Sequence, residues 1–164
     1  MKRTSLILLA ALTSGCALVG QQAYTVSSPA MEPTLKEGSH VITRLTGDDG
    51  YVPKPADIVV FTAPEWGKTA PHIFRVIGVP GSTVACCDER GRITVDQRPL
   101  DEPYIGGAAA SYRTFSLTVP PGRLWVLGDN RDQALDSRAH QGDPGVGTIA
   151  VKNVVGVVEV EKTG

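Results

Sequence analysis

The sequence predicts an all-β fold built from short antiparallel strands, and three observations support this fold class. The chain of 164 residues holds 18 Gly and 12 Pro, about 18% of its length, against ~12% in an average protein. Hydrophobic residues make up 41% of the chain, which is enough for a packed core. Short runs rich in β-branched residues alternate with turn signals. We therefore expect one small β domain with almost no helix.

The first element, residues 1–22, has the features of an export signal. Lys2 and Arg3 precede an apolar run at residues 6–12, and the next charged residue is Glu32. A basic region followed by an apolar region is typical of segments that direct a chain to the membrane. We therefore expect an N-terminal targeting or anchor segment ahead of the domain.

Three fates of this segment fit the sequence. Residues 13–16 resemble a lipobox, in which Cys16 is lipidated and becomes the mature N-terminus. Alternatively, residues 5–20 stay in the bilayer as a signal anchor, although they fall short of the ~20 residues of a spanning helix. The third fate is a plainly cleaved signal peptide. All three place residues 24–164 on the extracytoplasmic face of the cell membrane.

The expected strands follow along residues 24–164, each bounded by Gly, Pro, Asp or Asn. Clear boundaries are Pro80 and Gly81, and the Pro-Pro-Gly at residues 120–122. The strands are expected at residues 40–44, 57–62, 72–79, 83–86, 93–95, 114–119, 124–127 and 151–160. The last of these expected strands is the longest.

Composition excludes some classes of function. The formal charge is -1 and aromatic residues make up 5% of the chain, so neither a basic footprint nor stacking rings for nucleic acid are expected. No pair of Cys or His residues stands at the spacing of a metal site. The sequence therefore predicts no nucleic-acid partner, no metal and no cofactor.

Cys86 and Cys87 are neighbours in an expected strand. They can form a vicinal disulfide in an oxidising compartment or remain two free thiols on alternate faces of the strand. The simpler expectation is two thiols that are free or facultatively oxidised.

Three segments together resemble a known family. They are Ser-Ser-Pro-Ala-Met-Glu-Pro-Thr-Leu at residues 27–35, Phe-Arg-Val-Ile-Gly-Val-Pro-Gly-Ser-Thr-Val at residues 74–84, and Gly-Asp-Asn-Arg-Asp-Gln-Ala-Leu-Asp-Ser-Arg at residues 128–138. In order and spacing these segments resemble the sequence boxes of bacterial type I signal peptidases, peptidase family S26. The resemblance runs from about residue 26 to the end of the chain. It implies antiparallel strands arranged in sheets or a partial barrel.

The resemblance fails at the catalytic positions. Signal peptidases use a serine nucleophile and a lysine base, and these positions hold Ala30 and Phe74. A serine that orients the lysine is replaced by Ala134, whereas Ser28 keeps the hydroxyl that helps to bind the oxyanion. Neither a methyl group nor a phenyl ring can attack a carbonyl or accept a proton. The resemblance therefore implies an inactive homologue, a pseudoenzyme.

The third segment retains the residues that resemble a scaffold. In Asp136-Ser137-Arg138, the alternation can place both charges on one face and fix a loop. The residues assigned to the scaffold are Gly128, Asp129, Asn130, Arg131, Asp136, Ser137 and Arg138.

One rescue of the chemistry is conceivable. His72 lies two residues before Phe74, on the same face of a strand and roughly 6–7 Å along it. Ser28 and His72 could therefore form a shifted catalytic dyad. Catalysis by such a pair is the alternative to an inactive protein. The expected role of His40 and His140 is that of ordinary polar residues.

The resemblance also implies a groove for an extended substrate, between residues 23–30 and residues 71–74. Such a groove binds by strand addition, and Phe74 makes it apolar and narrow. The residues expected to line it are Val26, Ser27, Pro29, Met31, Pro71 and Ile73.

The leading hypothesis is thus a membrane-tethered, inactive signal peptidase homologue. Its expected partners are the membrane, signal-peptide or preprotein segments, or an active paralogue. The alternatives are an active signal peptidase with non-standard residues and a structural extracytoplasmic module.

Overall fold

Strands supply most of the regular structure in the computed structural model, which describes residues 20–47 and 50–160. Within these residues there is no α-helix, and four short 3₁₀ helices (η) complete the fold. The elements are β1 (Gln21–Thr25), η1 (Pro29–Met31), β2 (His40–Leu45), β3 (Ile58–Ala63), η2 (Pro64–Trp66), β4 (Lys68–Gly78), β5 (Thr83–Cys86), β6 (Ile93–Val95), β7 (Arg98–Pro99), η3 (Pro103–Ile105), β8 (Phe115–Thr118), β9 (Arg123–Leu127), β10 (Ile149–Ala150), η4 (Val151–Asn153) and β11 (Val154–Val158).

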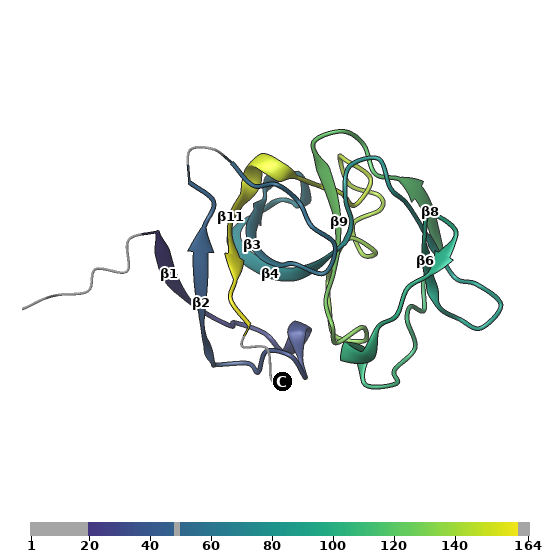
Figure 1. The fold of residues 1–164 in the computed structure, drawn as a ribbon, viewed down its shortest axis with the longest axis horizontal. Helices are drawn as coiled ribbons and strands as arrows, with labels where there is room; N and C mark the ends of the chain where they lie inside the picture. The colour runs from purple at the N-terminus through teal and green to yellow at the C-terminus, as the bar shows by residue number, and fades with distance from the viewer. Residues whose placement is uncertain (1–19, 48–49, 161–164) are drawn as a thin grey trace, which may run out of the picture.

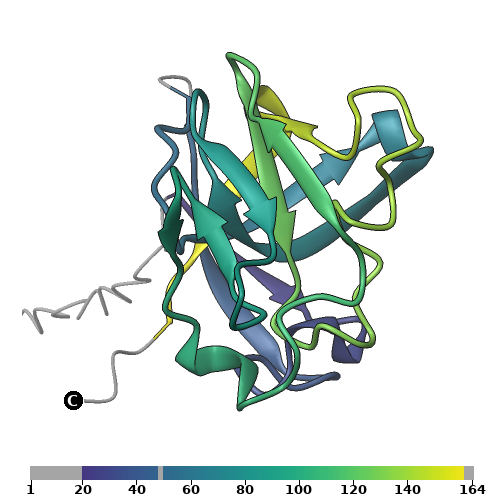
Figure 2. The same cartoon turned by 90° about the vertical axis from the view of Figure 1, so that its right-hand side faces the viewer.

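The strands form two antiparallel sheets. The large sheet has the order β1-β2-β11-β3-β4-β9-β10, and the small sheet has the order β7-β6-β5-β8. In Figure 1, β3 and β4 curve tightly, and β9 stands between them and the strands β6 and β8 of the small sheet. In Figure 2 the molecule is turned so that the small sheet faces the viewer. The predicted all-β antiparallel fold is confirmed.

Two hydrophobic clusters lie on opposite faces of β9. Side chains alternate between the two faces of a strand, so Leu124 and Val126 pack in the first cluster, whereas Trp125 and Leu127 pack in the second. The first cluster lies within the large sheet and includes Phe61, and the second lies against the small sheet. The first cluster is the one that reaches the candidate site.

Most strand predictions agree with the structure, but the last one is wrong in length. The strands expected at residues 83–86 and 93–95 are confirmed at their predicted bounds. Of residues 151–160, only Val154–Val158 form a strand, because Val151–Asn153 turn as η4. The longest strand is instead β4, with 11 residues.

The N-terminal predictions lie mostly outside the described residues. Residues 1–19, which hold Cys16 and the apolar run, are not described, whereas β1 begins at Gln21, inside the segment predicted to end at residue 22. No helix among the described residues has the length and apolar character needed to cross a membrane.

The state of Cys86 and Cys87, which the sequence left open, is a disulfide in this structure. A disulfide joins Cys86 and Cys87 at the end of β5. The vicinal arrangement that the sequence left open is therefore the one present.

Candidate functional site

The first sequence segment ends in η1, which carries Ala30 into the core. Proline fixes the φ angle that suits the first position of a helix, and Pro29 begins η1. Ala30 is buried, with 5% of its surface exposed. Its carbonyl oxygen accepts a hydrogen bond from the backbone N–H of Asn130 at 3.0 Å, and the Asn130 side chain donates to the carbonyl oxygen of Pro29 at 3.1 Å. The third segment thus holds the first one in place.

Gly128 allows these two segments to approach each other closely. A Cβ atom placed on Gly128 would lie 2.5 Å from the carbonyl oxygen of Ala30, and it would also collide with the Cβ atom of Ala134. Both contacts are too close for any side chain. Position 128 therefore requires glycine, and the glycine brings Ala30 and Ala134 to the same point.

Phe74 completes this convergence from β4. Its backbone pairs with Val59 of β3, and its side chain is 4% exposed within the same hydrophobic cluster as Ala30. Ala134 packs against that cluster, half-buried. The three positions that the resemblance assigns to nucleophile, base and orienting hydroxyl thus belong to one hydrophobic cluster. None of the three side chains carries a polar atom.

A buried ion pair lies behind this apolar centre. Arg75, next to Phe74, points to the other face of β4 and donates two hydrogen bonds to Asp129, from Nε at 2.8 Å and from Nη2 at 2.6 Å. Asp129 also accepts from the hydroxyl of Thr34. The Tyr104 ring lies beneath the guanidinium, 4.0 Å from ring centroid to Cζ. Asp129 therefore links all three sequence segments.

A second buried ion pair fixes the start of the third segment. Arg131 pairs with Glu102 and donates to the carbonyl oxygens of Gly128 at 3.1 Å and Ala110 at 2.6 Å. These bonds tie the Gly128 backbone to the loop before β8.

The predicted Asp136–Arg138 arrangement closes the same loop. Arg138 donates to Asp136 from Nε at 2.9 Å and from Nη2 at 2.7 Å, and the oxygen that accepts from Nη2 also accepts the Gly128 N–H at 3.0 Å. The hydroxyl of Ser137 accepts the N–H of Val126 at 2.9 Å. The buried residues of this segment are therefore hydrogen-bonded, as burial of polar groups requires.

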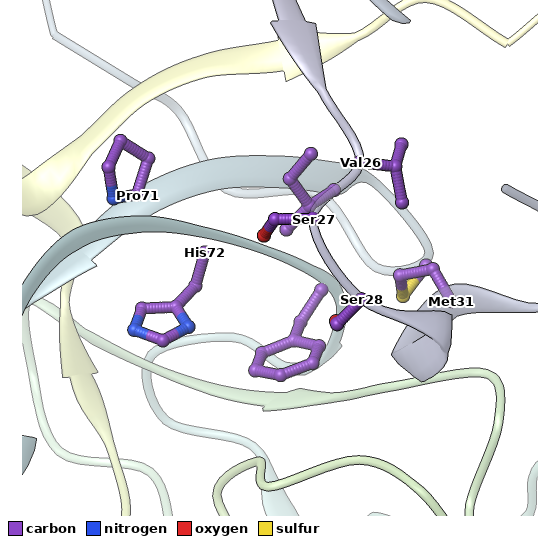
Figure 3. Close-up of a pocket in the computed structure, with 8 residues that line it drawn as sticks. Val26, Ser27, Ser28, Met31, Pro71 and His72 are labelled. Atoms are coloured by element: carbon purple, nitrogen blue, oxygen red, sulfur yellow. The ribbon is translucent and has the colours of Figure 1, made fainter. Parts of the chain in front are cut away.

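A narrow pocket lies between η1 and β4 (Figure 3). The volume open to water is about 30 Å³, which is room for one or two water molecules. The lining residues are Val26, Ser27, Ser28, Met31, Pro71, His72, Ile73 and Phe74. Of the residues predicted to line a groove, only Pro29 is absent from this wall.

Two strand edges that have no partner among the described residues lie next to this pocket. β1 lies at the end of the large sheet and pairs only with β2. The second edge of β4 pairs with β9 from Arg75 onward, so its part from Lys68 to Phe74 has a ladder on one side only. Unpaired strand edges can accept an added strand.

No hydrogen bond joins Ser28 and His72, the two residues of the shifted dyad. His72 Nε2 is buried and has no hydrogen-bond partner among the described residues. Figure 3 shows Ser28 at the start of η1 and His72 farther along β4, with Ser27 between the two backbones. Burial, and then the charges of Lys68 and His140, lower the pKa of His72. The imidazole is therefore neutral at neutral pH, but its Nε2 accepts no hydrogen bond from a hydroxyl among the described residues.

Further aromatic rings pack next to His72. The rings of Trp66 and His140 stack with centroids 4.3 Å apart, and His140 Nδ1 lies 2.6 Å from a carboxylate oxygen of Asp143. The sequence did not predict this stack or the partners of Arg75 and Glu102, because each contact joins residues far apart in the chain. Within the described part of the chain, no group of three or more His, Cys, Asp or Glu residues is placed to hold a metal ion.

Comparisons with known proteins agree on the relationship. The family model described as "Signal peptidase, peptidase S26" matches residues 1–161. Signal peptidase I of Mycobacterium tuberculosis is 34% identical over 186 residues, which cover 81% of this chain and 62% of that protein. Signal peptidase I of Bacillus caldolyticus is 31% identical and covers 83% of this chain and 76% of its own length.

A solved structure shares the fold. The crystal structure of a signal peptidase I from Enterococcus faecalis V583 superposes with a TM-score of 0.55 at 28% identity, and it covers 67% of this chain and 99% of that one. The chain studied spans less than two thirds of the length of the mycobacterial relatives.

Proposed function

The chain belongs to the signal peptidase family, peptidase S26, and we propose that it is an inactive member that binds extended peptide segments without cleaving them. The observation that carries this proposal is the convergence of Ala30, Phe74 and Ala134 in one apolar cluster. Acyl transfer by this family's chemistry needs a nucleophile and a base in contact. The converging side chains supply neither group.

The two free strand edges support the binding part of the proposal. A peptide that adds between residues 26–28 and the free part of β4 gains main-chain hydrogen bonds on both sides. The narrow pocket beneath it, with about 30 Å³ open to water, suits a small side chain. Peptides with alanine-like residues at alternate positions, as at the end of a signal peptide, have the matching shape.

Membrane attachment is part of the same proposal. Residues 1–22 would tether the domain to the extracytoplasmic face, either through a lipid on Cys16 or through residues 5–20. Mass spectrometry of the mature N-terminus separates these routes, because the lipoprotein route predicts a diacylglyceryl group on Cys16.

A cleavage assay tests the loss of activity. Purified protein is incubated with a preprotein, and the products are separated by electrophoresis. We expect no cleavage. Cleavage by the parent protein that disappears in the Ser28→Ala variant would instead show an active enzyme with non-standard residues.

A binding titration tests the groove. A non-cleavable peptide ending in Ala-x-Ala is titrated against the parent, against Ser28→Trp, which fills the pocket, and against Ser116→Trp, which adds the same ring to an exposed position of β8. We expect Ser28→Trp to weaken binding at least tenfold and Ser116→Trp to have no effect. If no peptide binds to any of the three proteins, the domain is a structural module with a closed groove.

A further inference from the structure

The disulfide between Cys86 and Cys87 lies outside the site described above. Cys86 is the last residue of β5, where it pairs with Ile93 of β6 and Phe115 of β8. Its side chain belongs to the second hydrophobic cluster and is 9% exposed, whereas Cys87 is exposed. One sulfur therefore belongs to the core and the other to a residue that solvent reaches.

This disulfide adds little to the stability of the folded protein. A disulfide restricts the unfolded chain in proportion to the logarithm of the loop that it closes. The two cysteines are adjacent in sequence, so the closed loop is the smallest that a protein can form. The backbone ladders of Cys86 with β6 and β8 already hold the end of β5 in the small sheet. Stabilisation of the fold is therefore a weak explanation for this disulfide.

We infer that the Cys86–Cys87 disulfide is a reversible exchange site for a dithiol reductant, with Cys87 as the sulfur that is attacked. Thiol–disulfide exchange requires access of a thiolate to one sulfur of the bond. The exposed residue is Cys87. The buried sulfur of Cys86 is then the leaving group. This inference is independent of the proposed function of the groove.

The exchange takes two steps, and its electrons and protons balance. A thiolate of the dithiol attacks Sγ of Cys87, the S–S bond breaks, and the electron pair leaves with Sγ of Cys86, which takes up a proton. The second thiol of the reductant then attacks the mixed disulfide and releases Cys87 as a thiol. The protein gains two electrons and two protons, and the dithiol becomes a disulfide.

The first test is alkylation of the folded full-length protein. Samples with and without dithiothreitol in native buffer are treated with iodoacetamide and then digested with trypsin. The mass of the peptide of residues 76–90, which excludes Cys16, is then measured. We expect no adduct without reductant and at least one adduct, on Cys87, with it, while the circular dichroism spectrum stays that of the folded protein. Two adducts without reductant, or adducts only after denaturation, would overturn the inference.

The second test identifies the attacked sulfur. Cys86→Ser leaves only Cys87 in the pair, and Cys87→Ser leaves only Cys86. Each variant is incubated with oxidised glutathione, and formation of the mixed disulfide on peptide 76–90 is followed by mass. We expect Cys87 to react at least tenfold faster than Cys86. Equal rates, or a faster reaction of Cys86, would contradict the assignment.

Discussion

The two sides of the loop at residues 128–138 differ in chemistry although they are only a few residues apart. On the pocket side, Ala30, Phe74 and Ala134 belong to one hydrophobic cluster and carry no polar side-chain atom. On the far side lie the buried ion pairs Arg75–Asp129, Arg131–Glu102 and Arg138–Asp136.

This difference shows which parts of the site the fold depends on. A buried methyl group or phenyl ring needs no hydrogen-bond partner, so apolar residues at the catalytic positions leave the fold intact. A buried ion pair that loses one partner leaves an uncompensated charge in the core. The chemistry can therefore be lost while the supporting ion pairs are kept.

Breaking the Arg75–Asp129 pair gives the largest expected effect. Asp129→Ala leaves the Arg75 guanidinium buried without its carboxylate, and we expect a loss of about 3–5 kcal/mol in the free energy of unfolding, measured by urea denaturation. The double variant Arg75→Met with Asp129→Leu removes both charges and should lose clearly less. A loss in the double variant as large as that of Asp129→Ala would show that the pair acts through packing and not through charge.

The junction between the two sides is tested by Gly128→Ala. The added methyl group meets the carbonyl oxygen of Ala30 and the side chain of Ala134, so we expect a loss of about 1–3 kcal/mol. Gly142→Ala is the matched control, since a Cβ atom there meets nothing within 4 Å. Equal melting temperatures of the two variants would contradict the close approach at Gly128.

The pocket side is tested by Ala30→Ser. The hydroxyl enters an apolar cluster and we expect a loss of about 1 kcal/mol, at the low end of the range for a buried polar group. Ala109→Ser, at an exposed position, should be neutral. Preprotein cleavage should stay undetectable in Ala30→Ser, because Phe74 provides no base. Cleavage by this single variant would mean that another group accepts the proton.

The smallest expected effect is a pH dependence that comes from His72. Its folded pKa lies below the unfolded value of 6.5, so the unfolded chain takes up a proton first as the pH falls. The titration of His72 therefore leaves the free energy of unfolding unchanged above pH 6.5. As the pH drops from 6.5 to the folded pKa of His72, the free energy of unfolding falls. We expect His72→Phe to show a smaller loss of unfolding free energy between pH 7 and pH 5 than the parent. His40→Phe, at an exposed position of β2, should follow the parent.

Local patterns in the sequence predicted much of the fold. The β-branched runs that form β5 and β6 are bounded by Gly, Pro or Asp, and both strands have their predicted bounds. The strand expected at residues 151–160 failed because residues 151–153 turn as η4 before the chain joins β2 and β3. The two-residue strands β7 and β10 are too short to leave a periodic signal.

The candidate site was predictable only where it follows the family's segments. The resemblance pointed to Ala30, Phe74 and Ala134, and the structure places them in one cluster. The partner of Arg131 could not be predicted, since Glu102 lies 29 residues away with no motif to connect them. Long-range pairs of this kind depend on the sheet topology and not on local pattern.

The free edge of β4 has a consequence for association of the protein with itself. An unpaired strand edge invites the same strand of a second molecule, and natural proteins discourage such pairing with lysine and proline. Lys68 and Pro71 are exposed on this part of β4. Proline offers no N–H to a neighbouring strand, and Lys68 places a positive charge on the edge. These two residues therefore keep the edge available to a short peptide while discouraging edge-to-edge aggregation at high protein concentration.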